Sequence, residues 1–113
     1  MPIAVLDPDL EKATARFFRV LGDPTRMRIL ELLSQGPLTV AEIVLGVGAT
    51  QSRVSTHLAC LKWCKFVEAR RDGRQMIYSL QDGEVHQLIE MAKSIAIHHR
   101  DHLATCSRIG PDW

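Results

Sequence analysis

Two cysteines four residues apart give this chain its most distinctive chemistry. Cys60 and Cys64 lie in the segment 50–64, where apolar residues recur at helical spacing. Side chains four residues apart on a helix share one face and lie about one turn from each other. The segment contains no acidic residue. Two neighbouring thiols without a carboxylate favour a large, soft metal ion over a hard one.

The same segment predicts a helix with one core-facing side and one polar side. Val54, Leu58 and Leu61 form the apolar stripe, and Arg53 falls on almost the same angular strip as the two thiols. Arginine pairs well with guanine, and the start of a helix suits phosphate groups or base edges. A metal ion held by the thiols would therefore act on a helix that reads DNA. The candidate DNA-contacting residues of this helix are Thr50, Gln51, Ser52, Arg53, Ser55, Thr56 and His57.

Positive charge is concentrated around this helix, although the net charge of the chain is only +1. Between Arg53 and Arg74 there are six Lys or Arg and two acids, a local charge of +4. The remainder of the chain therefore carries −3. A local excess of this kind favours a surface that faces phosphates, and the simpler alternative is a solvated charged face.

The preceding residues predict a helix-turn-helix. Asp-Pro pairs at 7–8 and 23–24 each offer an N-cap followed by proline at the first helical position. Thr39 and Glu42 form a capping box for a short helix, which we expect Gly46-Val47-Gly48 to break. The helix of residues 51–64 follows directly, and two helices joined by a glycine-containing turn are typical of this motif.

A β-hairpin is predicted after the helix-turn-helix. The runs 67–71 and 74–80 are rich in β-prone residues, and Asp72-Gly73 between them is a strong turn signal. Three further candidate DNA-contacting residues, Arg70, Arg71 and Arg74, lie at or beside the tip. Arginines there suit phosphates or the minor groove, and the alternative is a charged edge that prevents strand pairing.

The last part of the chain predicts a helix with a long apolar stripe. From Asp82 onward, residues such as Val85, Leu88, Ala92 and Ile95 follow a helical period. A small winged domain has little surface to cover this stripe, so we expect a homodimer with helices at about 8–21 and 82–106 in its interface. The alternative is a stripe packed within its own subunit. The expected fold is mainly α with a β-hairpin wing: one winged helix-turn-helix domain, 1–113.

Composition excludes several other classes. No segment approaches the roughly 18 to 20 apolar residues that span a bilayer, and the N-terminus is not typical of a signal peptide. We therefore expect a cytoplasmic protein without membrane partners. The chain has three cysteines, an odd number, and thiols in the cytosol are normally reduced. We therefore do not expect a disulfide framework. No nucleophile elbow, phosphate loop or acid pair is evident, so we do not expect an enzyme.

Three segments resemble the ArsR/SmtB family of bacterial winged-helix, metal-sensing repressors. They are Leu-Gly-Asp-Pro-Thr-Arg-Met-Arg-Ile-Leu at 21–30, Gln-Ser-Arg-Val-Ser-Thr-His-Leu at 51–58, and Asp-Gly-Arg-Gln at 72–75. The resemblance implies a dimer that occupies double-stranded operator DNA and leaves it when metal binds. Within the family, the chain is most similar to a cadmium- and lead-sensing branch.

That resemblance implies a metal site formed by Cys60, Cys64 and Cys106. Three thiolates suit cadmium or lead, with mercury a further candidate and zinc less favoured because a closed zinc site usually has four ligands. We expect Cys106 to reach the other subunit, although ligation within one subunit remains open. His98, His102 and Cys106 are spaced by four, so His102 is a candidate fourth ligand, or simply a solvated histidine.

Two other functions remain open from the sequence. A thiol-redox-sensing repressor of the same fold would use the same cysteines, and an interaction-only winged helix would use its groove for a protein. The C-terminal end of a helix disfavours a thiolate, which counts against a redox sensor. A metal ion displaces the thiol protons itself, so metal sensing is favoured.

Overall fold

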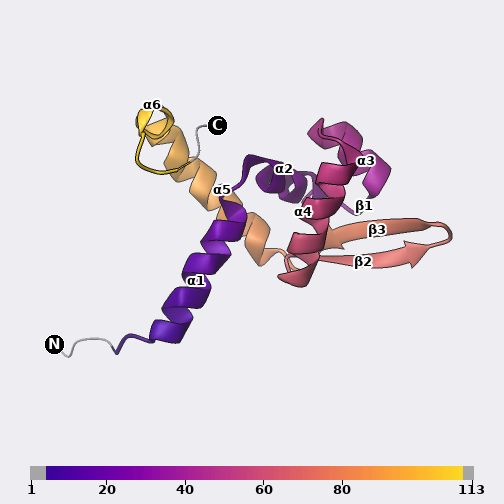
Figure 1. Ribbon diagram of the computed structural model, residues 1–113, viewed down its shortest axis with the longest axis horizontal. Coiled ribbons are helices and arrows are strands. Elements are labelled where there is room, and N and C mark those ends of the chain that lie inside the picture. Colours follow the sequence, from indigo (N-terminus) through magenta and orange to yellow (C-terminus); the bar gives the residue numbers. More distant parts are fainter. Residues whose placement is uncertain (1–4, 111–113) are drawn as a thin grey trace.

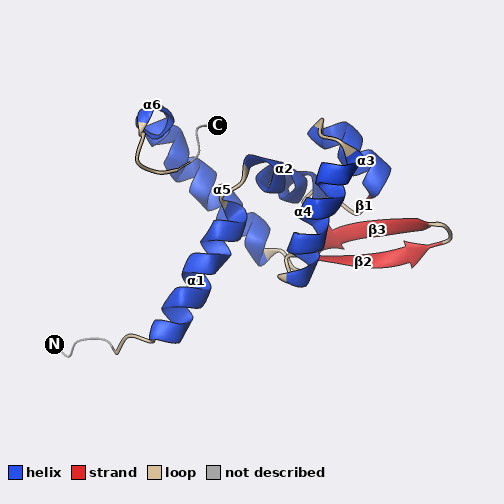
Figure 2. Cartoon of the chain, in the orientation of Figure 1, coloured by secondary structure: helices blue, strands red, loops and turns tan. Residues whose placement is uncertain are grey.

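Helices form most of the structure, and the strands are confined to one small sheet (Figures 1 and 2). The computed structural model describes residues 5–110. Its elements are α1 (Pro8–Leu21), α2 (Pro24–Leu33), β1 (Leu38–Thr39), α3 (Val40–Val47), α4 (Gln51–Trp63), β2 (Val67–Asp72), β3 (Gln75–Leu80), α5 (Glu84–Ala96), the short 3-10 helix η1 (Ile97–His99) and α6 (Arg100–Thr105). The predicted mainly helical fold with a β-hairpin wing is confirmed.

The first helices begin where the sequence predicts, because side chains satisfy their first backbone N–H groups. The Asp7 carboxylate accepts hydrogen bonds from the N–H groups of Asp9 and Leu10, and Asp23 does the same for α2. Thr39 and Glu42 form the predicted capping box at the start of α3. Each cap of this kind stabilises the helix by about 1 kcal/mol.

The helix-turn-helix consists of α3 and α4, and its turn differs slightly from the prediction. Gly46 does not break the helix, since α3 continues to Val47. The break is at Gly48, whose φ of +76° is the left-handed conformation that glycine adopts without strain. Thr50 then caps α4 by accepting a hydrogen bond from the N–H of Arg53 at 3.2 Å.

The core that holds these helices contains only apolar side chains; no polar or charged residue is buried within 5–110. The buried residues are Leu21, Ile29, Leu30, Leu33, Ile43, Val47, Val54, Leu58, Leu61, Phe66, Val67 and Ile89. Val54, Leu58 and Leu61 confirm the predicted core-facing stripe of α4. Burying this stripe fixes which side of α4 faces outward.

The hairpin is present, but its turn lies one residue later than predicted. β2 and β3 pair from Val67↔Leu80 to Asp72↔Gln75, so the turn is Gly73-Arg74. Asp72 joins the ladder, while Gly73 takes a φ of +63° that suits a residue without Cβ. The two-residue strand β1 also pairs with β3, which makes a three-stranded sheet. A strand this short has no alternation from which it could be predicted.

The helical region predicted at about 82–106 consists of three segments instead of one. Regular α-helix ends at Ala96, and the 3-10 turn η1 precedes α6. Cys106 follows the last helical residue and has extended backbone angles, φ −77° and ψ 110°. His98, His102 and Cys106 therefore do not share the continuous helical stripe that their spacing suggested.

The molecule is elongated because two helical arms leave the central body. Its extents are 58 × 34 × 22 Å and its radius of gyration is 16.3 Å. A compact domain of this length would have a radius of about 13 Å. Figure 1 shows α1 and the α5–α6 region extending from the body that holds α2, α3, α4 and the sheet. Most of their surface therefore faces solvent in the isolated chain.

Candidate DNA interface and metal centre

The outer side of α4 carries the predicted DNA-contacting residues. Gln51, Ser52, Arg53, Ser55 and Thr56 are all exposed, as is the capping residue Thr50. The Thr56 hydroxyl donates to the Ser52 carbonyl at 3.0 Å, so its oxygen can still accept a hydrogen bond from a donor group on a DNA base. The helix therefore presents a polar surface whose backbone is fixed by the buried stripe on the opposite side.

His57 differs from the other candidate readers because it is tied to a second helix. The Arg26 Nε–H of α2 donates to His57 Nδ1 at 3.1 Å, and the imidazole is half-buried. Arg26 Nη1 also donates to the Val20 carbonyl of α1 at 3.4 Å. One guanidinium thus links α1, α2 and α4, the helix that carries the candidate DNA-reading residues and is called the reading helix below. Arg26 was not among the predicted site residues, although it lies in the Asp-Pro-Thr-Arg motif of the family resemblance.

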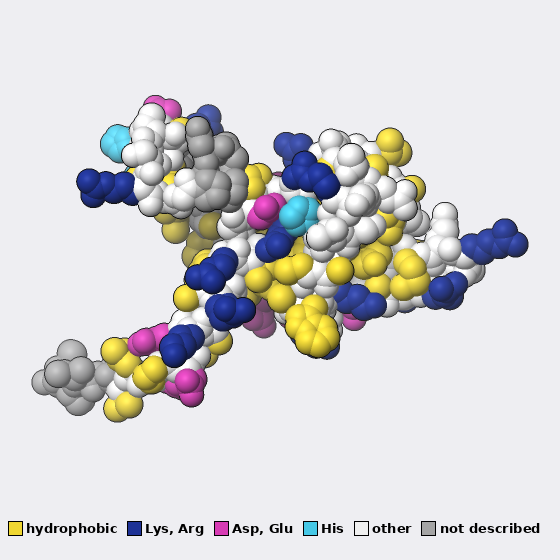
Figure 3. Space-filling model, viewed as in Figure 1, with side chains coloured by type: hydrophobic (Ala, Val, Ile, Leu, Met, Phe, Trp, Pro, Cys, Tyr) yellow, Lys and Arg dark blue, Asp and Glu magenta, His cyan; other side chains and the backbone are white. Residues whose placement is uncertain are grey.

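The wing arginines lie at the free end of the hairpin. Arg70 and Arg71 are exposed on β2, and Arg74 is exposed in the turn. Successive strand residues point to opposite faces, so Arg70 and Arg71 face different sides of the ribbon. No ion pair to these arginines occurs in the part of the chain that the structure describes. Figure 3 shows Lys and Arg side chains gathered at this end, where they are available to phosphates.

Cys60 and Cys64 come together at the C-terminal end of α4. Cys60 is half-buried, Cys64 is exposed at the C-cap, and neither is in a disulfide. Partial burial raises the pKa of the Cys64 thiol, and the neighbouring Cys60 raises it further, while Arg26 and Arg16 act in the opposite direction. Their spacing of four residues at the end of α4 puts the two thiol side chains on one side of the helix, about one turn apart. A soft cation that displaces both thiol protons fits this donor pair.

The structure does not bring Cys106 to this pair within one subunit. Figure 1 shows α6, which Cys106 follows, at the opposite end of α5 from the place where α4 ends. No three His, Cys, Asp or Glu side chains within 5–110 form a group that could hold a metal ion. One subunit therefore provides two thiols of the expected three-thiol site.

Trp63 lies between the two thiols in sequence and is 85% exposed. From the sequence alone, Trp63 is either a packing residue or a residue at the DNA edge. An indole this exposed does not pack within its own subunit. It places a large aromatic side chain on the surface at the end of α4, one residue before Cys64.

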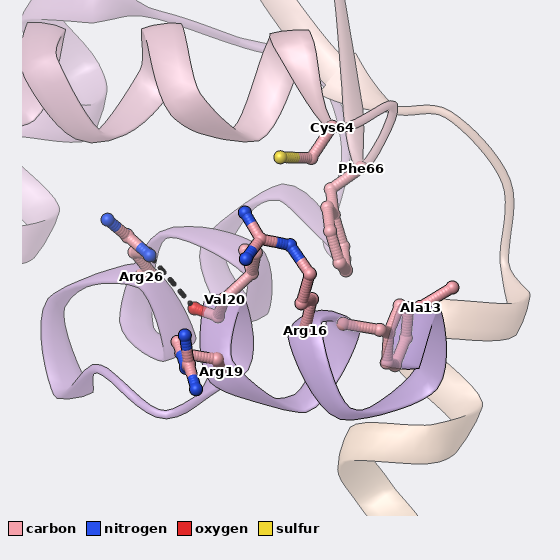
Figure 4. Close-up of a pocket in the computed structure, with 8 residues that line it drawn as sticks. Ala13, Arg16, Arg19, Val20, Arg26, Cys64 and Phe66 are labelled. Atoms are coloured by element: carbon pink, nitrogen blue, oxygen red, sulfur yellow. Dashed lines mark hydrogen bonds between the residues drawn. The ribbon is translucent and has the colours of Figure 1, made fainter. Parts of the chain in front are cut away.

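A cavity of about 490 Å³ opens beside Cys64, between the end of α4 and the helices α1 and α2. Its lining residues are Ala13, Arg16, Phe17, Arg19, Val20, Arg26, Cys64 and Phe66. Figure 4 shows the Cys64 sulfur on the cavity side, with the Arg16 side chain extending towards it. The arginines of α1 were not predicted as site residues, because only the fold brings them to α4.

These elements define a winged helix-turn-helix protein, and comparison with known proteins identifies its family. Residues 23–69 match the family described as "Bacterial regulatory protein, arsR family". The chain is 46% identical over 96 residues to the "Probable mercury resistance operon repressor" of Streptomyces lividans, covering 85% of this chain and 77% of that protein. The chain therefore belongs to the ArsR family.

Two further relatives agree with this assignment. The HTH-type transcriptional regulator CmtR of Mycobacterium tuberculosis is 44% identical over 75 residues, covering 66% of this chain and 64% of CmtR. The solution structure of the homodimeric winged helix-turn-helix DNA-binding domain of Mb0332 from Mycobacterium bovis superposes with a TM-score of 0.75. It is 29% identical, and the match covers 90% of this chain and 94% of that domain. None of the helices described in the present structure is long and apolar enough to cross a bilayer.

Proposed function

We propose that this protein is a metal-responsive transcriptional repressor that binds operator DNA as a homodimer and releases it on binding a soft metal ion. The observation that carries the proposal is the pair of free, adjacent thiols at the end of the reading helix. Membership of the ArsR family and the mercury repressor relative support it. Such a regulator acts where the DNA lies, so we expect it in the cytoplasm.

The dimer would form through α1 and the α5–α6 region. Large apolar side chains are exposed on both arms: Leu10, Phe18, Met91, Ile95, Ile97 and Leu103. Exposed apolar side chains in this number commonly mark an interface, and the homodimeric Mb0332 domain has the same fold. A two-fold dimer would present two reading helices and two wings to half-sites about one helical turn apart, roughly 34 Å.

Each metal site would combine Cys60 and Cys64 with Cys106 of the partner subunit. Within one subunit, Cys106 follows an exposed arm that is remote from α4, which suits ligation across the dimer. Cadmium and lead fit a set of thiolates, and the mercury repressor relative gives mercury comparable support. Zinc is less favoured because the described residues offer no carboxylate or imidazole in a group with the thiol pair.

Release of DNA would follow from linkage between the two kinds of site. A metal ion that bridges α4 to the partner's arm favours one arrangement of the reading helices over the DNA-bound arrangement. A coupling free energy of about 1 to 3 kcal/mol would change operator affinity roughly 5- to 150-fold. The candidate readers on α4 and the wing arginines would form the DNA contacts that this change disrupts.

Anaerobic titration of a complex with promoter DNA tests the proposal. Cadmium, lead or mercury should release the DNA from the fully reduced protein, and Cys60→Ser, Cys64→Ser and Cys106→Ser should each abolish release. Ala59→Ser, which adds a hydroxyl beside the pair and removes no sulfur, is the matched control and should respond as wild type does. Release that persists without the cysteines would disprove the metal assignment.

A thiol-redox-sensing repressor is the second candidate, because Cys64 is exposed and next to another free thiol. The raised pKa of Cys64 counts against it, since a smaller thiolate fraction slows reaction with oxidants. Release by peroxide or disulfide in the absence of metal, with no response to metal under reducing conditions, would select this alternative. If the protein bound no promoter fragment at any salt concentration, an interaction-only winged helix would be indicated instead.

A further inference from the structure

The cavity beside Cys64 has the chemistry of an anion site. Arg16 and Arg19 of α1 line it together with Arg26 of α2, and no Asp or Glu is among its lining residues. Neither Arg16 nor Arg19 makes a side-chain hydrogen bond or ion pair within residues 5–110. Three arginine side chains around a cavity whose lining holds no carboxylate favour a negatively charged ligand, and Arg16 is the one whose guanidinium extends towards Cys64 (Figure 4).

The remaining walls of the cavity are apolar. The rings of Phe17 and Phe66 are stacked, with centroids 5.0 Å apart, and Ala13 and Val20 complete the lining. A volume of about 490 Å³ accommodates a small organic molecule and exceeds what a lone inorganic ion needs. The cavity therefore suits a ligand with a short carbon skeleton and at least one carboxylate.

The position of Cys64 indicates what such a ligand would deliver. Its sulfur faces the cavity and the Arg16 side chain reaches towards it (Figure 4). A carboxylate held by the arginines would place the other end of a small molecule at the sulfur. In a reducing compartment, soft metal ions are held by thiols, so the molecule that carries one to the protein is itself a thiol complex.

We propose that this cavity receives carboxylate-bearing small thiols in complex with the soft metal ion, and that the arginines direct the complex to Cys64. The inference rests on the proposed metal-sensing function. In the exchange, Cys64 and then Cys60 each form a metal–sulfur bond as one carrier thiolate leaves. Each protein thiol gives its proton to a departing carrier thiolate, so two carrier thiols are released and no oxidant or reductant is required.

The test compares mercury transfer from an anionic and a neutral carrier. Full-length protein is mixed in a stopped-flow instrument with mercury bis-mercaptosuccinate or with mercury bis-2-mercaptoethanol, and metal–thiolate absorption is followed. The ratio of the two rate constants should fall about tenfold in Arg16→Gln, because the positive charge that extends towards Cys64 is lost. Arg16→Lys should retain most of the ratio, and Arg100→Gln on α6, which removes the same charge elsewhere, should leave it unchanged.

An unchanged ratio in both Arg16→Gln and Arg19→Gln would overturn the anion site while leaving the metal-sensing function intact. If neither carrier delivers metal, the proposed metal-sensing function is wrong. The anion site is then tested separately with disulfide reagents, which need no metal. In a Cys60→Ser, Cys106→Ser protein, the anionic reagent 5,5′-dithiobis(2-nitrobenzoate) should lose rate relative to neutral 2,2′-dithiodipyridine when Arg16→Gln is added. Equal losses for the two reagents would overturn the proposal.

Discussion

At the level of a single residue, Cys64 would make the proposed metal binding dependent on pH. Partial burial and the neighbouring Cys60 hold the pKa of the Cys64 thiol above its ordinary value, so the thiol is protonated at neutral pH. A metal ion must displace that proton, and the displacement becomes easier as pH rises towards the thiol pKa. The apparent metal affinity should therefore increase by about tenfold per pH unit for each proton displaced.

Competition titration with a chelator between pH 6 and 8 measures this dependence. The chelator's own pH dependence is corrected for, and the Cys64→Ser protein should show a shallower slope. A flat profile for the wild-type protein would mean that the thiols are already ionised, contrary to the raised pKa of Cys64.

Arg26 is expected to couple α2 to the reading helix through its hydrogen bond to His57. Arg26→Gln and His57→Ala should each lower the free energy of unfolding by about 1 kcal/mol, and the double variant by less than the sum. Both variants should also weaken operator binding, because the side chain of His57 lies on the flank of the DNA-facing surface. Strict additivity in denaturant unfolding would show that the two side chains do not interact in solution.

At the level of single residues, helical periodicity predicted which side of α4 is buried and that Cys60 and Cys64 share one side, whereas the DNA-reading role of the exposed residues stays a prediction. It did not predict Arg16 and Arg26 beside Cys64. These residues lie more than 35 positions from Cys64, and only the packing of α1 and α2 against α4 brings them to it.

Among the elements, the turn of the helix-turn-helix depends on Gly48. Its φ of +76° is a conformation that costs other residues about 1 to 2 kcal/mol. Gly48→Ala should lower stability by that amount in thermal or denaturant unfolding and weaken DNA binding through a displaced α4. Gly83→Ala is the matched control, since Gly83 has φ −83° and open space around it. Equal effects of the two changes would contradict the strain at Gly48.

The predicted and observed elements differ where local signals compete. Asp72-Gly73 is a frequent turn pair, yet the β ladder extends through Asp72 and the turn moves to Gly73-Arg74. The two-residue strand β1 is defined only by its antiparallel pairing with β3, a contact distant in sequence. The starts of α1, α2 and α3 were predicted accurately because their capping residues are local signals. The interruption at η1 could not be predicted in this way, since it contains no proline or glycine.

For the whole molecule, the exposed apolar arms predict a homodimer. Phe18 is 53% exposed and Ile95 is 58% exposed, so a glutamate at either position would place a charge in the proposed interface. Phe18→Glu and Ile95→Glu should dissociate the dimer in analytical ultracentrifugation and weaken DNA binding at least tenfold, since one reading helix is lost. Leu45→Glu is the control, because Leu45 is 86% exposed on α3, away from both arms, and should remain dimeric.

The exposure of Trp63 gives the proposed metal site an intrinsic optical reporter. Trp63 is the last residue of α4 and precedes Cys64, so its indole should lose fluorescence when a heavy ion binds to the thiols, in proportion to occupancy and without any added dye. Trp113→Phe would leave Trp63 as the only tryptophan, since the chain contains two. Emission from that single indole would then report how fast the ion arrives, while a labelled operator reports how fast the DNA departs.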